Sequence, residues 1–170
     1  MFHRGEFSYI IARIDLKHYR FIIVSTFMPK ELIAKAQITI DAPAEKVWEA
    51  LTDPAIIKEY MFGADVVTDW EVGSSIVWKG EWEGKPFEDK GKIVEIQEEK
   101  MMHYTHYSPM TGEEDKPENY HNVIVKLSEK GGETTVTLTQ DGSSDEKERA
   151  QSEKNWKMMM KGLKKVVESE

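Results

Sequence analysis

From residue 36 onward, hydrophobic and polar positions repeat with periods that change along the chain, and each period predicts an element. Residues 36–40 alternate apolar and polar side chains, which is typical of a half-buried strand. Two prolines follow, and proline is favoured at the first position of a helix. We therefore expect two short helices, one beginning at Pro43 after a cap at residue 41 or 42, and one beginning at Pro54 after a cap at Asp53.

A long stretch of strand patterns comes next. Alternating apolar residues bounded by turn residues predict six strands, over residues 64–70, 75–82, 87–97, 100–108, 120–128 and 134–140. Residues 83–86 and 130–132 have the composition of hairpin connections, whereas residues 109–119 are polar, contain two prolines and predict a loop. Strands that are joined by hairpins form an antiparallel sheet.

The last element has the clearest pattern. Ser143 and Glu146 have the spacing of a capping box, in which the serine hydroxyl caps the helix and the glutamate reaches back. An apolar stripe then recurs at steps of three and four residues between Trp156 and Val167. Because this is the only long amphipathic helix in the pattern, it should cover one face of the sheet. The expected architecture is α+β: a curved antiparallel sheet wrapped around a long C-terminal helix, with space between them.

The N-terminal residues do not follow this pattern. Residues 9–27 are rich in Ile, Val and Phe, but charged residues interrupt the run, so it predicts neither a membrane-spanning helix nor a signal peptide. We expect residues 1–30 to be an N-terminal extension and residues 31–170 to be the folded domain. An alternative is a mis-assigned start, because Met28 directly precedes the clean domain pattern.

The amino-acid composition argues against several classes of protein function. The 170 residues carry a net charge of −8, and acidic residues outnumber basic ones, which argues against a general nucleic-acid binder. The chain has no cysteine, which excludes a disulfide scaffold and a thiolate metal site. Serine-nucleophile, Walker and dinucleotide-binding motifs are absent, and we expect no cofactor. The remaining expectation is a cytoplasmic protein.

Two histidines, one tyrosine and two tryptophans are the candidate functional residues. His103 and His106 lie three residues apart on a strand, so they point to opposite faces and should not share a metal ion. His106 shares a face with Tyr104, and the two side chains serve either as polar contacts for a ligand, as an acid–base pair, or as satisfied core residues. Trp78 and Trp156 line a pocket or fill the core.

The run from Ile38 to Pro54 resembles the opening of START-like (SRPBCC) helix-grip domains, in the branch named for the activator of the Hsp90 ATPase. Residues 73–78, 102–106 and 135–142 support the resemblance, which covers about residues 36–168. It implies the helix-grip fold, which is also called START-like or Bet v 1-like. Members of this class include ligand carriers, co-chaperone domains and cyclase-like enzymes, so the fold alone does not choose the function.

The resemblance also implies which side chains face the space between sheet and helix. These inward residues would be Trp78, Tyr104, His106, Gln140, Trp156, Met160 and Leu163. His106 stands where the branch often has Trp, and Gln140 where it often has His. The leading hypothesis is a domain that binds a small apolar or amphipathic molecule. The alternatives are an interaction domain for an Hsp90-type chaperone, and a cyclase- or hydrolase-like enzyme that uses His106 and Tyr104.

Overall fold

The computed structural model describes residues 11–14, 21–24 and 32–169, and the chain divides into two units, Met1–Lys30 and Glu31–Glu170. In the first unit, strands β1 (Ile11–Ile14) and β2 (Phe21–Val24) pair antiparallel. The interpretation of residues 1–30 as an extension, or as a mis-assigned start, concerns residues that lie mostly outside the described ranges, and it stays a prediction.

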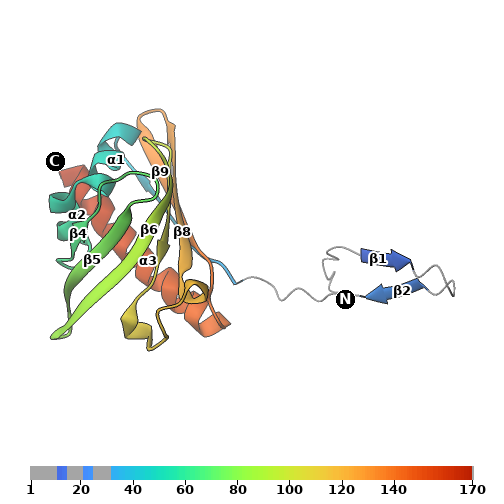
Figure 1. Cartoon of the computed structure of the whole chain (residues 1–170). Coiled ribbons are helices and arrows are strands. Elements are labelled where there is room, and N and C mark those ends of the chain that lie inside the picture. Colours follow the sequence, from blue (N-terminus) through green and yellow to red (C-terminus); the bar gives the residue numbers. More distant parts are fainter. Residues whose placement is uncertain (1–10, 15–20, 25–31, 170) are drawn as a thin grey trace. The chain divides into compact units, whose positions relative to one another are not determined.

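The second unit contains a seven-stranded antiparallel sheet and one long helix, α3 (Glu146–Ser169), which lies against the sheet (Figure 1). The strand order is β3-β9-β8-β7-β6-β5-β4. In chain order the strands are β3 (Ala34–Ile40), β4 (Asp65–Val67), β5 (Ser75–Trp82), β6 (Lys85–Gln97), β7 (Met101–His106), β8 (His121–Lys130) and β9 (Glu133–Gln140). The predicted α+β helix-grip architecture is confirmed.

Several predicted boundaries differ from the structure. Strand β4 ends at Val67 instead of residue 70, and Trp70 beyond it has a φ of 56°. The β5–β6 connection is a two-residue turn of Glu83 and Gly84, both with positive φ, so β6 begins two residues earlier than expected. Residues 109–119 are confirmed as a connection, and they contain two short 3-10 turns, η1 (Pro109–Thr111) and η2 (Pro117–Asn119).

The two short helices are α1 (Ala44–Thr52) and α2 (Pro54–Tyr60). Asp53 caps α2 as predicted, because its side chain accepts hydrogen bonds from the first amides of that helix. Helix α1 begins one residue later than predicted, and Pro43 is its N-cap, with no side chain that accepts a hydrogen bond. The first amide of α1 donates instead to Glu129 of β8, 2.8 Å away. A distant strand therefore replaces the local cap that the sequence suggested.

The start of α3 also differs from the predicted capping box. The Asp145 carboxylate accepts a hydrogen bond from the Glu148 amide at 2.8 Å, so the capping pair lies two residues later than expected. The hydroxyl of Ser143 is buried and has no hydrogen-bond partner among the described residues. Hydrogen bonds from the hydroxyl and the amide of Ser144 lower the pKa of Glu148. The prediction failed because two overlapping pairs, Ser143 with Glu146 and Asp145 with Glu148, satisfy the same sequence pattern.

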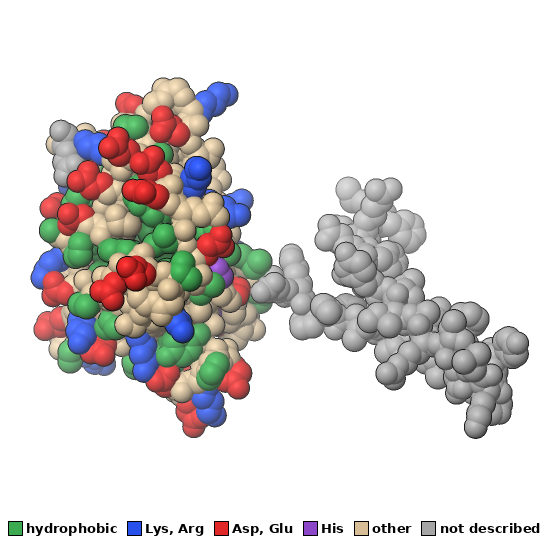
Figure 2. Space-filling model, turned by 45° about the horizontal axis from the view of Figure 1, so that its top comes forward, with side chains coloured by type: hydrophobic (Ala, Val, Ile, Leu, Met, Phe, Trp, Pro, Cys, Tyr) green, Lys and Arg blue, Asp and Glu red, His purple; other side chains and the backbone are tan. Residues whose placement is uncertain are grey.

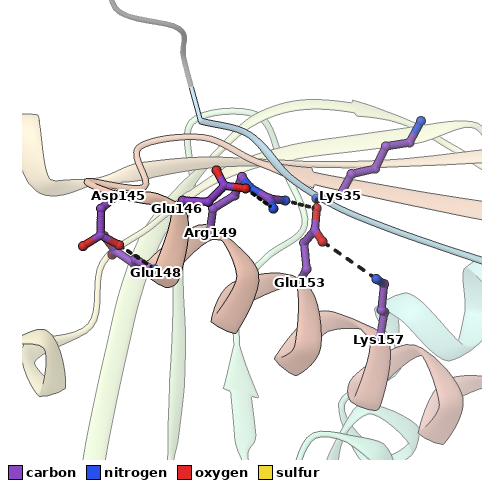
Figure 3. Close-up of polar contacts among 7 residues, drawn as sticks. All are labelled: Lys35, Asp145, Glu146, Glu148, Arg149, Glu153 and Lys157. Carbon is purple, nitrogen blue, oxygen red and sulfur yellow. Dashed lines mark hydrogen bonds and ion pairs between the residues drawn. The ribbon is translucent and has the colours of Figure 1, made fainter.

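Helix α3 covers the open edge of β3 (Figure 3). Backbone groups of the strand and of the residue after it form hydrogen bonds with charged side chains of the helix at three places: Lys35 N with Glu153 (3.1 Å), Thr39 O with Lys164 (2.7 Å) and Asp41 N with Glu168 (2.8 Å). Arg149 holds Glu153 in position at 2.5 Å. Edge strands with free backbone groups promote aggregation, and these contacts protect this one.

A close approach of two strands shapes the middle of the sheet. A Cβ atom at Gly91 of β6 would lie 1.6 Å from the carbonyl oxygen of Thr105 in β7, so only glycine fits there. The β6–β7 register also shifts between Ile93 and Glu95. Bulges and glycines of this kind bend strands. The bend lies next to the side chains that form the candidate site.

Candidate functional site

A cavity of about 350 Å³ lies between α3 and the sheet. Ligand sites in proteins commonly have volumes of about 300–1,000 Å³, so this space suits a small molecule. Its lining comes from the end of α2, strands β5 to β9, the η1 turn and the first half of α3. Strands far apart in sequence meet here because the antiparallel sheet curves around the helix.

Five of the seven residues that the resemblance implied line this cavity: Trp78, Tyr104, His106, Gln140 and Trp156. The two departures from the family pattern, His106 and Gln140, are therefore brought to the same space. Met160 and Leu163 do not line it. They are 1 % and 0 % exposed and border an adjoining internal space of about 40 Å³, which shares Trp78 and Tyr104 with the larger cavity.

An aromatic wall forms one side of the cavity. The ring of Trp78 lies 5.3 Å from that of Tyr104 and 5.4 Å from that of His106, centre to centre. Both geometries are tilted or edge-on, as aromatic pairs prefer. Burial raises the pKa of the Tyr104 phenol, which therefore stays protonated and able to donate a hydrogen bond at neutral pH.

His106 forms a polar pair with Asp89 of β6. The Nε2 atom of His106 lies 3.0 Å from Oδ2 of Asp89, and the side chains are 22 % and 17 % exposed. An ionised carboxylate only accepts hydrogen bonds, so Nε2 carries the proton. The other carboxylate oxygen, Oδ1, is buried without a partner among the described residues. Such an orphaned acceptor is unusual in native proteins, so a donor such as a water molecule or a ligand is expected at this oxygen.

A second histidine joins the cavity from β8. His121 is the cross-strand partner of His106, and both residues line the cavity. The Nδ1 atom of His121 donates to the Asp141 carbonyl at 2.9 Å. Gly142 makes this contact feasible, because it has a φ of 79° and a Cβ there would lie 2.3 Å from Nδ1.

His103 does not join this group. It makes a hydrogen bond of 2.9 Å to Asn122. Within the described residues, no three His, Asp or Glu side chains come together as a metal-binding set.

One hydrogen bond links the helix to the end of the sheet at the cavity wall. The indole Nε1 of Trp156 donates to the side-chain oxygen of Gln140 at 2.6 Å. Trp156 is thereby held in one orientation, with its ring against the cavity. The NH2 group of Gln140 is the part of that amide left to contact a ligand.

Asp89 is the main site residue that the sequence analysis missed, because an acidic residue on a polar strand normally faces solvent. The hairpin between β5 and β6 contained the information that could have placed Asp89 at the site. A two-residue turn at Glu83 and Gly84 pairs Trp82 with Lys85 and therefore Trp78 with Asp89. The predicted connection covered residues 83–86, and a four-residue connection leaves this register open. The cavity residues Phe62, Phe87, Glu148 and Ser152 carried no comparable signal.

A curved antiparallel sheet that holds one long C-terminal helix, with two short helices after its first strand, defines the helix-grip class. The crystal structure of Ara h 8.0201 shares this fold, with a TM-score of 0.65 and 14 % identity over 81 % of this chain and 98 % of that one. The fold does not reveal the function of this chain.

Within this class the chain belongs to the family described as activator of Hsp90 ATPase homolog 1-like protein, whose profile matches residues 41–168. The solution structure of a protein from Cytophaga hutchinsonii is 54 % identical, with a TM-score of 0.73 over 84 % of this chain and 97 % of that one. The Aha1 dimer from Colwellia psychrerythraea is 21 % identical, with a TM-score of 0.62 over 79 % and 95 %. Among curated proteins, none matches. No helix in the described part of the chain has the length and apolar character to cross a membrane.

Proposed function

We propose that residues 31–170 form a domain that binds a small apolar or amphipathic molecule between the sheet and α3. The observation that carries the proposal is the cavity of about 350 Å³ with its aromatic wall. Apolar surface that leaves water contributes about 25 cal/mol per Å², so a ligand that buries its apolar part here gains affinity without a covalent step.

The cavity residues contribute to binding in two ways. Trp78 and Trp156 supply apolar contact area, and Tyr104, His106 and Gln140 supply the few polar groups that orient a ligand. Met160 and Leu163, which the resemblance placed among the contact residues, support the core instead of touching the ligand.

A cavity-filling variant tests this proposal. Ser152 of α3 lines the cavity, and Ser152→Phe should weaken binding of the neutral dye N-phenyl-1-naphthylamine at least about ten-fold, or about 1.4 kcal/mol. Lys154→Phe adds the same side chain at an exposed position of the same helix and should leave the affinity unchanged. Circular dichroism checks that both variants fold. Equal affinities for the two variants, or no dye binding by the unaltered protein, would contradict the proposal.

A second candidate is interaction with an Hsp90-type chaperone, and membership of the activator family favours it. The test is the ATPase rate of an Hsp90-type chaperone with and without this protein, together with co-purification. An unchanged rate and no co-purification would exclude this function. A cytoplasmic location remains a prediction, which fractionation of cells that produce the protein would check.

A further inference from the structure

The cavity lining contains two histidines, His106 and His121, and its other charged side chains all have one sign. Its described lining includes two carboxylates, Asp89 and Glu148, and no Lys or Arg. We propose that the ligand is a cationic amphiphile, with a protonated amine group on an apolar body. This inference rests on the proposed function, because it names the ligand class for the same cavity.

The two carboxylates stand at different parts of the wall. Glu148 belongs to the first turn of α3, and its hydrogen bonds with Ser144 lower its pKa, which keeps it negatively charged at neutral pH. Asp89 lies on β6 with one oxygen on His106 and the other without a donor. A ligand N–H is a donor of the missing kind, and the soft χ2 torsion of a carboxylate lets a small rotation turn that oxygen toward it.

The aromatic rings of the wall favour a cation for a separate reason. The faces of Trp and Tyr rings carry negative charge density and attract ammonium groups within about 6 Å. Trp78, Tyr104 and Phe87 come from the sheet, and Trp156 comes from the helix. A cation among these rings is therefore surrounded by favourable partners, in addition to the two carboxylates.

An anionic ligand, such as a fatty acid, would find no Lys or Arg in the described lining of the cavity. Two basic side chains next to the site residues of β6 and α3 are already paired: Lys90 with Asp115, and Arg149 with Glu146 and Glu153. A helix N-terminus can also bind an anion, but Asp145 already accepts a hydrogen bond from a first-turn amide of α3. A buried carboxylate without a partner is costly.

The net charge of the whole molecule also favours a cationic ligand. The net charge is −8, although acidic and basic side chains are interspersed on the face that Figure 2 presents. A negative protein attracts cations and repels anions at long range, which raises the association rate of a cationic ligand.

A matched series of ligands tests the inference. Octylamine, octanol and octanoate share one chain and differ in charge. Their binding to the full chain is measured by tryptophan fluorescence at pH 8, where an alkylamine is protonated and imidazole is ordinarily neutral. Octylamine should bind at least about ten-fold more tightly than octanoate, with octanol between them. Octanoate that binds as tightly as octylamine would overturn the inference and leave the proposed function intact. If none of the three ligands nor the neutral dye binds, both fail.

Variants test whether the two carboxylates cause the preference for octylamine over octanoate. Asp89→Asn and Glu148→Gln should each reduce the ratio of octylamine to octanoate affinity by about three-fold. Glu98→Gln removes one charge at an exposed position in the turn between β6 and β7 and should leave the ratio unchanged. If Asp89→Asn fails to fold, Glu148→Gln and the ligand series still decide the matter. An unchanged ratio in the folded cavity variants would refute recognition by these groups.

Discussion

Replacing Gly91 with alanine tests whether the close contact of β6 and β7 holds both the fold and the cavity wall. The new Cβ would lie 1.6 Å from the carbonyl oxygen of Thr105, whereas ordinary contacts begin at 3.4 Å. The two strands would have to separate by about 1.8 Å, the difference between these distances. A hydrogen bond stretched by that amount is lost.

The hydrogen bonds that the substitution would break determine the expected loss of stability. Lys90 and Tyr107 exchange two backbone bonds of 3.0 and 2.8 Å, and the amide of Lys92 donates to the Thr105 hydroxyl at 3.0 Å. Each such bond contributes about 0.5–1.5 kcal/mol, so losing all three costs about 2–4 kcal/mol. For a chain of this size the melting temperature should fall by about 5–15 °C. The same separation pulls His106 from Asp89, so binding of the neutral dye should weaken as well.

Thermal unfolding followed by circular dichroism measures the first effect, and a dye titration below the transition measures the second. Gly80→Ala is the control. Its new Cβ would lie 2.9 Å from the far end of the Phe87 ring, which a small ring movement relieves, and 3.4 Å from the Ala64 backbone, which is an ordinary contact. In thermal unfolding it should therefore cost less than half as much. If Gly91→Ala melted at the same temperature as the unaltered protein, the argument from the strand contact would be wrong.

Three further predictions concern local stability. Thr134→Val removes a buried hydrogen bond of 2.7 Å to a backbone carbonyl and should cost about 1–2 kcal/mol in urea unfolding. Thr135→Val removes a solvent-exposed hydroxyl contact with Thr39 and should cost almost nothing, and equal costs would refute the role of burial. Asp145→Ala should cost about 0.5–2 kcal/mol because it removes the cap of α3, and Ser143→Ala should be nearly neutral; the reverse order in the same assay would restore the cap that the sequence suggested. Because the pKa of Glu148 is lowered in the folded state, its stabilising contribution is present above its ordinary pKa of 4.5 and is lost as the pH falls through the lowered value. Amide exchange at the start of α3 should accelerate over that acidic range relative to the core strands, and equal acceleration of both would contradict this assignment.

Much of the architecture followed from local patterns. The stripe from Trp156 to Val167 predicted the long helix, and Asp53 before Pro54 predicted a helix start, because caps and periodicity act within a few residues. The paired strands followed from alternation and from glycine-rich turns. The family resemblance between Ile38 and Pro54 then suggested the helix-grip class, which the structure and the comparisons confirm.

Local sequence patterns did not predict the contacts between segments that are far apart in the chain. The cap of α1 comes from Glu129 on another strand, and the partner of His106 is Asp89, 17 positions earlier in the chain. The residue types and the hydrophobic periodicity did not predict which residues of β6 pair with those of β5 and β7. A shift by one residue would turn Asp89 to the opposite face, so its place in the cavity depended on the turn geometry.

The sequence alone therefore determined the elements, their order and the apolar face of the terminal helix, because each depends on neighbours close in the chain. Only the tertiary structure decided that Met160 and Leu163 belong to the core while Asp89 and Glu148 border the cavity. Which side chain fills space and which one borders a cavity depends on how sheet curvature and helix position combine, and that combination is a property of the whole fold.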